Sequence, residues 1–144
     1  MSAQRCAGQV LEVVPSVMRI VRKQMRSRRG EGLSVPQFRA LWVIDHNRSA
    51  CLSDVAEHIG SSLPSTSRMV AALVDSALVR RKTDSCDRRQ CCLELTPRGE
   101  AVLKIAWGHT HLVFAQRLAG LSGAQRSIVV QAMDLLRSVF VKDV

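Results

Sequence analysis

The sequence predicts a mainly α-helical chain that carries one small β-hairpin. Apolar residues recur at intervals of three or four through most of the 144 residues, which is the period of an amphipathic helix. This period changes to alternation only between about residues 78 and 95, as expected for paired strands. Aromatic residues make up 3% of the chain and Tyr is absent, so the core must be built from aliphatic side chains, which suit helix packing.

The first predicted helix runs from about residue 9 to residue 29. Its apolar face consists of five valines: Val10, Val13, Val14, Val17 and Val21. Lys and Arg crowd its final turns, where positive charge complements the negative end of the helix dipole. Gly30 and Gly32 are expected to end this helix.

Three shorter helices are expected next. A capping box begins the second helix at Ser34. Ser53 is expected to cap a short third helix, which Gly60 ends. Ser62 then caps a fourth helix with Pro64 in its first turn, where the missing N–H of proline costs nothing.

The β-hairpin follows the fourth helix. Residues 78–83 and 90–95 are predicted as two strands around a polar, charged tip at residues 84–89. In the second strand Cys91, Leu93 and Leu95 alternate with Cys92 and Glu94, so Cys91 is expected to lie in the core. Thr96 and Pro97 then begin a helix that extends to about residue 119. A second capping box at Ser122 begins the last helix.

This order of elements is that of a winged helix-turn-helix core, which we assign to residues 33–99. The flanking regions, residues 1–32 and 100–144, have wide apolar faces that one small domain is too small to bury. A second copy of the chain is expected to cover them, which predicts a homodimer. The N- and C-terminal regions are therefore dimerisation helices, and the whole chain forms one intertwined unit.

The formal net charge of +9 predicts a polyanionic partner, with nucleic acid as the first candidate. The scarcity of aromatic side chains disfavours a protein that stacks single-stranded bases. No segment approaches the ~20 apolar residues of a membrane span, and the first ten residues lack an apolar signal segment, so we expect no membrane partner and a cytoplasmic location. Five cysteines without a C-x-x-C pair favour neither a disulfide framework nor a metal, and no cofactor is expected.

Two segments carry the expected chemistry. Helical spacing places Pro64, Ser65 and Arg68 on one outward face of the fourth helix, where hydroxyl, backbone N–H and guanidinium groups suit phosphates and base edges. Arg88 and Arg89 at the hairpin tip suit the negative potential of a minor groove. Each segment alone also fits a simpler description, an ordinary amphipathic helix and a solvated charged turn.

Three motifs together point to a family. They are S-x-x-x-x-S-R-x-V at residues 62–70, D-x-x-D-R-R at 84–89 and L-T-x-x-G at 95–99. With them, residues 33–99 resemble the winged-helix core of the MarR (multiple antibiotic resistance regulator) family. The resemblance implies a homodimeric bacterial transcription regulator that binds an inverted repeat in double-stranded DNA. The fourth helix would then enter the major groove, and Arg88 or Arg89 the minor groove.

The chain departs from the family pattern at two positions of the core. Ser85 stands where Pro is frequent in the wing. Ala77 stands where Gly often ends the recognition helix, and a left-handed turn is costlier for Ala than for Gly.

These considerations predict the residues of the functional sites. The DNA-binding residues that we expect are Ser53, Ser62, Pro64, Ser65, Thr66, Ser67, Arg68, Lys82, Asp84, Arg88 and Arg89. The resemblance also implies repression that a small phenolic or other aromatic ligand relieves. The residues expected to face this ligand are Met18, Arg19, Arg22, Phe38, Trp42, His46 and Trp107. Thiol oxidation is the other implied release mechanism. Its candidate is Cys86, whose neighbouring arginines favour a thiolate, although an incidental surface cysteine is the simpler and preferred interpretation.

Other classes of protein are weighed against this interpretation. The chain lacks the nucleophile elbow, glycine-rich phosphate loop and H-E-x-x-H motifs of common enzymes, so we expect no enzyme. The main alternative is an architectural DNA-binding protein without sequence preference, whose affinity would come from phosphate contacts alone. A winged-helix module for protein contacts is a third class. Repression and activation would use the same fold, and the target genes are not encoded in these motifs.

Overall fold

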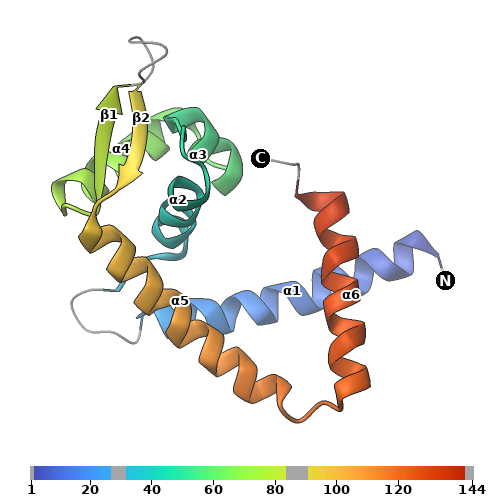
Figure 1. Ribbon diagram of the computed structural model, residues 1–144. Coiled ribbons are helices and arrows are strands. Elements are labelled where there is room, and N and C mark those ends of the chain that lie inside the picture. Colours follow the sequence, from blue (N-terminus) through green and yellow to red (C-terminus); the bar gives the residue numbers. More distant parts are fainter. Residues whose placement is uncertain (1, 27–31, 84–90, 142–144) are drawn as a thin grey trace. The chain divides into compact units, whose positions relative to one another are not determined.

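The computed structural model describes residues 2–26, 32–83 and 91–141. Its elements, in chain order, are α1 (Ala3–Arg26), α2 (Val35–His46), α3 (Leu52–Ile59), α4 (Leu63–Asp75), β1 (Val79–Thr83), β2 (Cys91–Leu95), α5 (Pro97–Leu118) and α6 (Gly123–Phe140) (Figure 1). The predicted fold class, mainly α-helical with a small β-hairpin wing, is confirmed. The chain divides into two compact units, residues 1–110 and 111–144, and each is described by itself. The proposed boundaries of the core at residues 33 and 99 remain a prediction.

Most of the predicted helix caps are present. The Ser34 hydroxyl accepts a hydrogen bond from the N–H of Gln37 at 3.3 Å, and the Gln37 side chain accepts one from the N–H of Ser34 at 2.9 Å. Ser62 caps α4 by accepting from the N–H of Ser65, and a capping box at Ser122 begins α6. These caps satisfy backbone donors that a helix leaves unpaired in its first turn, which is why they recur in the sequence.

Two predicted helix starts are wrong. The first helix begins at Ala3, not near residue 9, and its predicted end lies partly outside the described residues. The third helix is not capped by Ser53, because it begins at Leu52 with Cys51 in the cap position. Asp54 takes the stabilising role there, since its carboxylate accepts the N–H of Cys51 at 2.9 Å. Ser53 instead lies exposed in the first turn.

The two strands form an antiparallel ladder from Val79 opposite Leu95 to Thr83 opposite Cys91. The linker between α2 and α3 lies against the same strand, because the N–H of Leu93 donates to the carbonyl of Ala50 at 2.8 Å. This further neighbour of β2 breaks the simple alternation predicted from the sequence. Cys92 and Leu93 are both buried, and Cys91, predicted to lie in the core, is exposed.

The core of the first unit is aliphatic, as the composition predicts. Its largest fully buried apolar side chains come from α2, α3, α4 and β1, and they are Leu41, Val55, Val70, Leu73 and Val79. Helices α2, α3 and α4 and the hairpin therefore pack into one body (Figure 1). Within the described part of the chain, no helix combines the length and apolar character needed to cross a membrane.

The N- and C-terminal helices expose much of their apolar surface. Leu11 of α1 is 74% exposed, although a helix of this length usually buries one face. In the second unit, no residue of α6 is buried. Its most exposed large apolar residues are Ile128, Val130, Leu135, Val139 and Phe140.

Candidate nucleic-acid interface

Helices α3 and α4 and the short turn between them form the helix-turn-helix. Gly60 ends α3 in a left-handed conformation, with φ of 68°, which glycine adopts without steric cost. Ser62 then caps α4, and Pro64 lies in its first turn. The turn therefore has the residues that its backbone geometry needs, and it fixes α4 next to α3.

The first two turns of α4 present most of the predicted DNA-binding residues at the surface. Ser62, Pro64, Ser65 and Arg68 are exposed, and Ser67 is half-buried. Arg68 lies three residues after Ser65, so the two side chains share one face. Backbone N–H groups at a helix N-terminus carry partial positive charge. This end of α4 can therefore bind phosphate oxygens and donate to base edges.

Thr66 is a correction to the predicted interface. Its side chain is 0% exposed and belongs to the inward face of α4 with Val70 and Leu73. Its hydroxyl has no hydrogen-bond partner among the described residues. Thr66 therefore contributes to packing of the helix and does not reach a DNA surface in this conformation.

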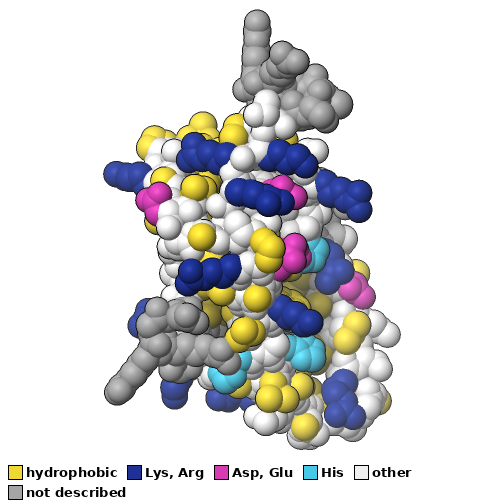
Figure 2. All heavy atoms as spheres, turned by 60° about the vertical axis from the view of Figure 1, so that its left-hand side comes forward, with side chains coloured by type: hydrophobic (Ala, Val, Ile, Leu, Met, Phe, Trp, Pro, Cys, Tyr) yellow, Lys and Arg dark blue, Asp and Glu magenta, His cyan; other side chains and the backbone are white. Residues whose placement is uncertain are grey.

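The outer part of β1 is strongly basic. Arg80, Arg81 and Lys82 are consecutive and exposed, and Lys and Arg side chains gather on the part of the surface where the hairpin lies (Figure 2). Arg80 is held by Glu94 of the neighbouring strand at 3.0 Å, and this hydrogen bond lowers the pKa of Glu94. The sequence analysis selected only Lys82, although the run of three basic residues was a signal for the other two.

Four predicted residues of the hairpin tip lie outside the described residues. They are Asp84, Cys86, Arg88 and Arg89. Their proposed roles in minor-groove binding and in redox sensing remain predictions.

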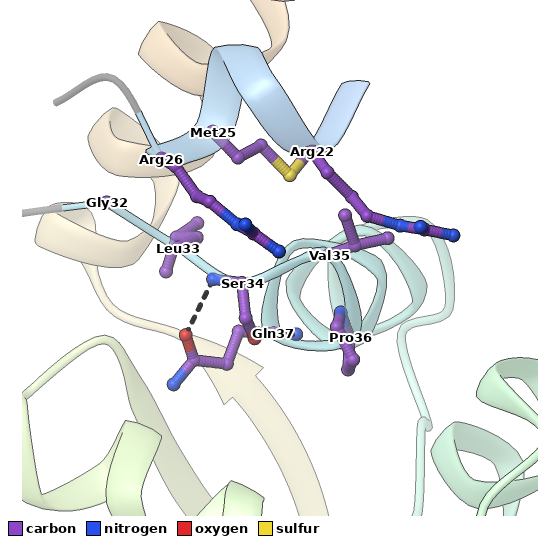
Figure 3. A pocket seen from close by; sticks show the side chains of 9 residues that line it. All are labelled: Arg22, Met25, Arg26, Gly32, Leu33, Ser34, Val35, Pro36 and Gln37. Carbon is purple, nitrogen blue, oxygen red and sulfur yellow. Dashed lines mark hydrogen bonds between the residues drawn. The ribbon is translucent and has the colours of Figure 1, made fainter. Parts of the chain in front are cut away.

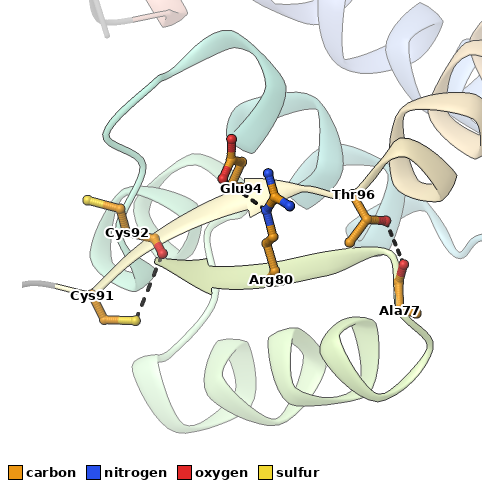
Figure 4. Close-up of polar contacts among 6 residues, drawn as sticks. All are labelled: Ala77, Arg80, Cys91, Cys92, Glu94 and Thr96. Carbon is orange, nitrogen blue, oxygen red and sulfur yellow. Dashed lines mark hydrogen bonds and ion pairs between the residues drawn. The ribbon is translucent and has the colours of Figure 1, made fainter. Parts of the chain in front are cut away.

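The base of the hairpin is joined to α5 by the L-T-x-x-G motif (Figure 4). The Thr96 hydroxyl donates to the carbonyl of Ala77 and accepts from the N–H of Gly99 at 3.0 Å. The N–H of Thr96 donates to the carbonyl of Leu78 at 3.1 Å. A side chain at position 99 would meet that same carbonyl, since a Cβ there would lie 2.0 Å from its oxygen. The motif therefore fixes the direction of the hairpin relative to the end of α4.

A second contact fixes α3. The Arg39 guanidinium of α2 donates to the carbonyl of His58, near the end of α3, at 2.8 Å. Burial, and then the positive charge of Arg39, lower the pKa of His58 below its ordinary value of 6.5. His58 also stacks on Trp42 of α2, with ring centroids 5.6 Å apart. The neutral form of His58 is therefore the one that the folded helix-turn-helix favours.

One cavity lies between the end of α1 and the start of α2 and has a volume of about 620 Å³. We call it the arginine cavity, because Arg22 and Arg26 extend from α1 toward the first turn of α2 (Figure 3). Its remaining lining is Met25, Gly32, Leu33, Ser34, Val35, Pro36 and Gln37. Two guanidinium groups above an apolar lining suit a ligand with a carboxylate or phenolate group.

A second cavity, of about 460 Å³, lies between α2 and α5. We call it the tryptophan cavity, and its lining is Trp42, Asp45, His46, Glu100, Leu103, Lys104 and Trp107. The structure thus brings together three of the predicted ligand residues, Trp42, His46 and Trp107. The charged residues of α5 were not predicted, although Glu100, Leu103, Lys104 and Trp107 follow the spacing of one helix face.

The remaining predicted ligand residues are dispersed. Arg22 lines the arginine cavity, and Phe38 stacks on Trp107 with ring centroids 6.2 Å apart. Met18 is half-buried and Arg19 exposed, and neither lines the two cavities. The described residues contain no group of three His, Cys, Asp or Glu side chains placed to hold a metal ion.

Known proteins with similar sequences are helix-turn-helix regulators, in agreement with the helix-turn-helix described above. Residues 33–91 match the model of the MarR family. The chain is 27% identical over 104 residues to YfiV, an uncharacterized HTH-type transcriptional regulator of Bacillus subtilis. That match covers 72% of this chain and 65% of YfiV, so the chain spans less than two thirds of that relative.

Two solved structures share the fold along nearly the whole chain. FabT of Streptococcus pneumoniae, solved in complex with DNA, is 17% identical with a TM-score of 0.76, and the match covers 96% of both chains. CouR of Rhodococcus jostii, solved with bound p-coumaroyl-CoA, is 22% identical with a TM-score of 0.76 and coverage of 94% and 92%. At these identities the likeness concerns the fold, whereas the family match concerns the sequence of the core itself. Residues 33–91 are therefore similar in sequence to the MarR family, and the chain as a whole is similar in fold to FabT and CouR.

Proposed function

We propose that this protein is a sequence-specific transcription regulator that binds an inverted repeat in double-stranded DNA as a homodimer. The observation that carries the proposal is the exposed start of α4, where Ser65 and Arg68 share one face after the short turn that begins at Gly60. The basic strand β1 adds phosphate-binding charge beside it. FabT, which has the same fold, was solved bound to DNA. In the family, repression is the usual outcome of such binding.

The proposed homodimer explains the exposed apolar surface. Leu11, Val13, Val14 and Val17 of α1 are between 37% and 74% exposed, and α6 buries none of its residues. Each fully buried Leu or Val side chain stabilises an assembly by about 1.5–3 kcal/mol relative to exposure. To meet successive major grooves, the two copies of α4 in such a homodimer would have to lie about 34–36 Å apart.

Release from DNA is proposed to follow binding of a small organic ligand in the cavities that α2 forms with α1 and α5. The volumes of about 620 and 460 Å³ are in the range of small-molecule pockets. CouR provides a structural neighbour with a bound phenolic acyl-CoA. Oxidation of Cys86 is the second proposed route of release, because a modified hairpin tip would disturb contacts to DNA.

A second candidate function is an architectural DNA-binding protein without sequence preference. The net charge of +9 and the exposed basic strand β1 favour it. Its affinity would come from phosphates alone and would fall steeply with salt at every site equally.

Selection of bound duplexes from a random DNA pool distinguishes the two functions. The reduced, purified protein is expected to enrich one inverted repeat. Tight, salt-sensitive binding without enrichment would instead establish the architectural function. Absence of any binding would contradict both and would favour a module for protein contacts.

A further inference from the structure

We propose that the tryptophan cavity binds a flat organic cation that carries N–H donors, such as an aromatic amidine or amine. This inference rests on the proposed function, because the cation would be one of the ligands that release the proposed regulator from DNA. It differs from the phenolic ligand that the family resemblance implies. The charge, the hydrogen-bonding groups and the rings of the cavity carry it.

The charges of the cavity favour a positive ligand. Two of its lining residues are carboxylates, Asp45 and Glu100, in a chain that has 21 basic and only 12 acidic residues. The Asp45 carboxylate lies 3.6 Å from the His46 ring, and 43% of its side chain is exposed, so it has room for a further partner. Lys104 is the one Lys or Arg among the described residues of this lining. An anion would therefore meet net repulsion in this cavity.

The hydrogen-bonding groups of the cavity also favour such a cation, because two of them are carboxylates, which accept hydrogen bonds. Nδ1 of His46 lies 2.9 Å from the carbonyl of Trp42. A carbonyl accepts only, so Nδ1 donates the hydrogen of that bond. The two carboxylates give the cavity several acceptors, and a ligand that donates N–H groups pairs with them.

The aromatic side chains provide the flat part of the site. Trp107 is 53% exposed at the cavity and lies parallel to Phe38, with an interplanar angle of 2°. Trp42 also lines the cavity and is stacked on His46, with ring centroids 4.1 Å apart. The face of an indole ring attracts cations more strongly than other side-chain rings.

The arginine cavity has the opposite charge and favours a negative ligand. Among the described residues that line it, Arg22 and Arg26 are the charged groups, and none is Asp or Glu. A carboxylate or phenolate is therefore expected to bind at the α1 side of α2, and a cation at the α5 side. The two cavities divide ligands by the sign of their charge.

The test compares benzamidine, benzamide and benzoate, which share a ring and differ in charge. Trp42 and Trp107 are the only tryptophans of the chain and both line the cavity, so intrinsic fluorescence reports on this site. We expect benzamidine to quench it at the lowest concentration and benzoate at the highest. Equal binding of the three probes, tighter binding of benzoate, or no quenching up to the solubility limit would overturn the proposal.

Variants of the charged lining residues test whether benzamidine binds in this cavity. Asp45→Asn and Glu100→Gln are each expected to weaken benzamidine binding about twofold to fivefold, the range of partly exposed ion pairs. Lys104→Met is expected to strengthen it. Asp75→Asn removes the same charge from exposed Asp75 on α4, outside the cavity lining, and is expected to leave the affinity unchanged. Equal effects of Asp45→Asn and Asp75→Asn would overturn the proposal.

Failure of this proposal is separable from failure of the proposed function. Probe binding is measured on the protein without DNA, and duplex selection without a probe. A protein that selects an inverted repeat but binds benzoate better than benzamidine keeps its function as a regulator and loses this ligand class.

Discussion

Ala77 has a backbone conformation that its side chain does not favour. Its φ of 58° is left-handed, and within the described residues no other non-glycine residue has a positive φ. A left-handed residue other than glycine costs roughly 1–2 kcal/mol because Cβ approaches the following carbonyl. The conformation persists because the chain must turn from α4 into β1 at this point. The left-handed turn at this position was expected from the sequence, since Gly often stands here in the MarR family, which residues 33–99 resemble.

Replacing Ala77 with Gly is expected to stabilise the fold. The gain should be about 0.5–1 kcal/mol, because the relief of strain exceeds the added entropy of the unfolded chain. Urea denaturation measures the change. As a matched control, Ala72→Gly in the exposed, helical part of α4 should destabilise by about 1 kcal/mol. A loss of stability in Ala77→Gly would contradict the role assigned to this residue.

His58 makes the stability of the helix-turn-helix depend on pH. Its pKa is lowered in the folded state, first by burial and then by Arg39. Between that lowered pKa and 6.5 the unfolded chain binds more protons, so stability rises with pH through this window and is lost as the pH falls through it. Arg39→Gln should raise the pKa of His58, as measured by NMR titration of its ring protons.

Arg48→Gln is the control for that titration, because exposed Arg48 is not among the groups that shift His58. It should leave the pKa of His58 unchanged. The same pKa of His58 in the wild type and in Arg39→Gln would show that Arg39 does not act on the ring.

At the scale of elements, local signals explain which parts were predictable. The caps at Ser34, Ser62 and Ser122 depend on residues three positions apart, and all of them were predicted. The start of α3 was predicted wrongly because Cys51, not Ser53, is in the cap position, and Asp54 three residues later accepts the N–H of Cys51. The burial of Cys92 was missed because the α2–α3 linker, distant in sequence, lies against β2.

Gly99 of the L-T-x-x-G motif lets α5 pack closely against the backbone of Leu78, just before β1. Gly99→Ala places a Cβ against the carbonyl of Leu78, a backbone atom that cannot rotate away. We expect a loss of about 1–3 kcal/mol in unfolding free energy, as for other overpacked sites. Gly108→Ala, at a helical position of α5 where nothing lies within 4 Å, should be neutral or stabilising. Comparable denaturation midpoints for the two variants would contradict the close packing at the hairpin base.

At the scale of the whole molecule, the sequence predicted the order of elements but not the cavities. Periodicity and caps are local, so they predicted six helices and one hairpin in the order observed. The tryptophan cavity unites Asp45 of α2 with Glu100 of α5, and no local pattern joins residues so far apart. The inward orientation of Thr66 follows from helical spacing, since Val70 and Leu73 lie four and seven residues after it on the same buried face, so its selection as a DNA contact disagreed with that pattern.

The apolar surface of α6 predicts a dimer that one charge can break. Leu135 is 70% exposed, and Leu135→Glu should place a charge in the interface and shift the protein from a dimer toward the monomer mass of 15.9 kDa. Sedimentation equilibrium measures this. Gln131→Glu adds the same charge at another exposed position of α6 and should preserve the dimer. A wild-type protein that sediments as a monomer at all concentrations would contradict the proposed assembly.

The most direct test of the central claim is the affinity of the protein for its selected duplex and for a shuffled duplex of the same composition, at one salt concentration. The wild type should prefer the selected duplex by about a thousandfold or more. Arg68→Ala should reduce that preference by about tenfold to a hundredfold, whereas Arg126→Ala on α6, with the same change of charge, should not. Equal affinity of the wild type for both duplexes would contradict sequence-specific recognition by α4.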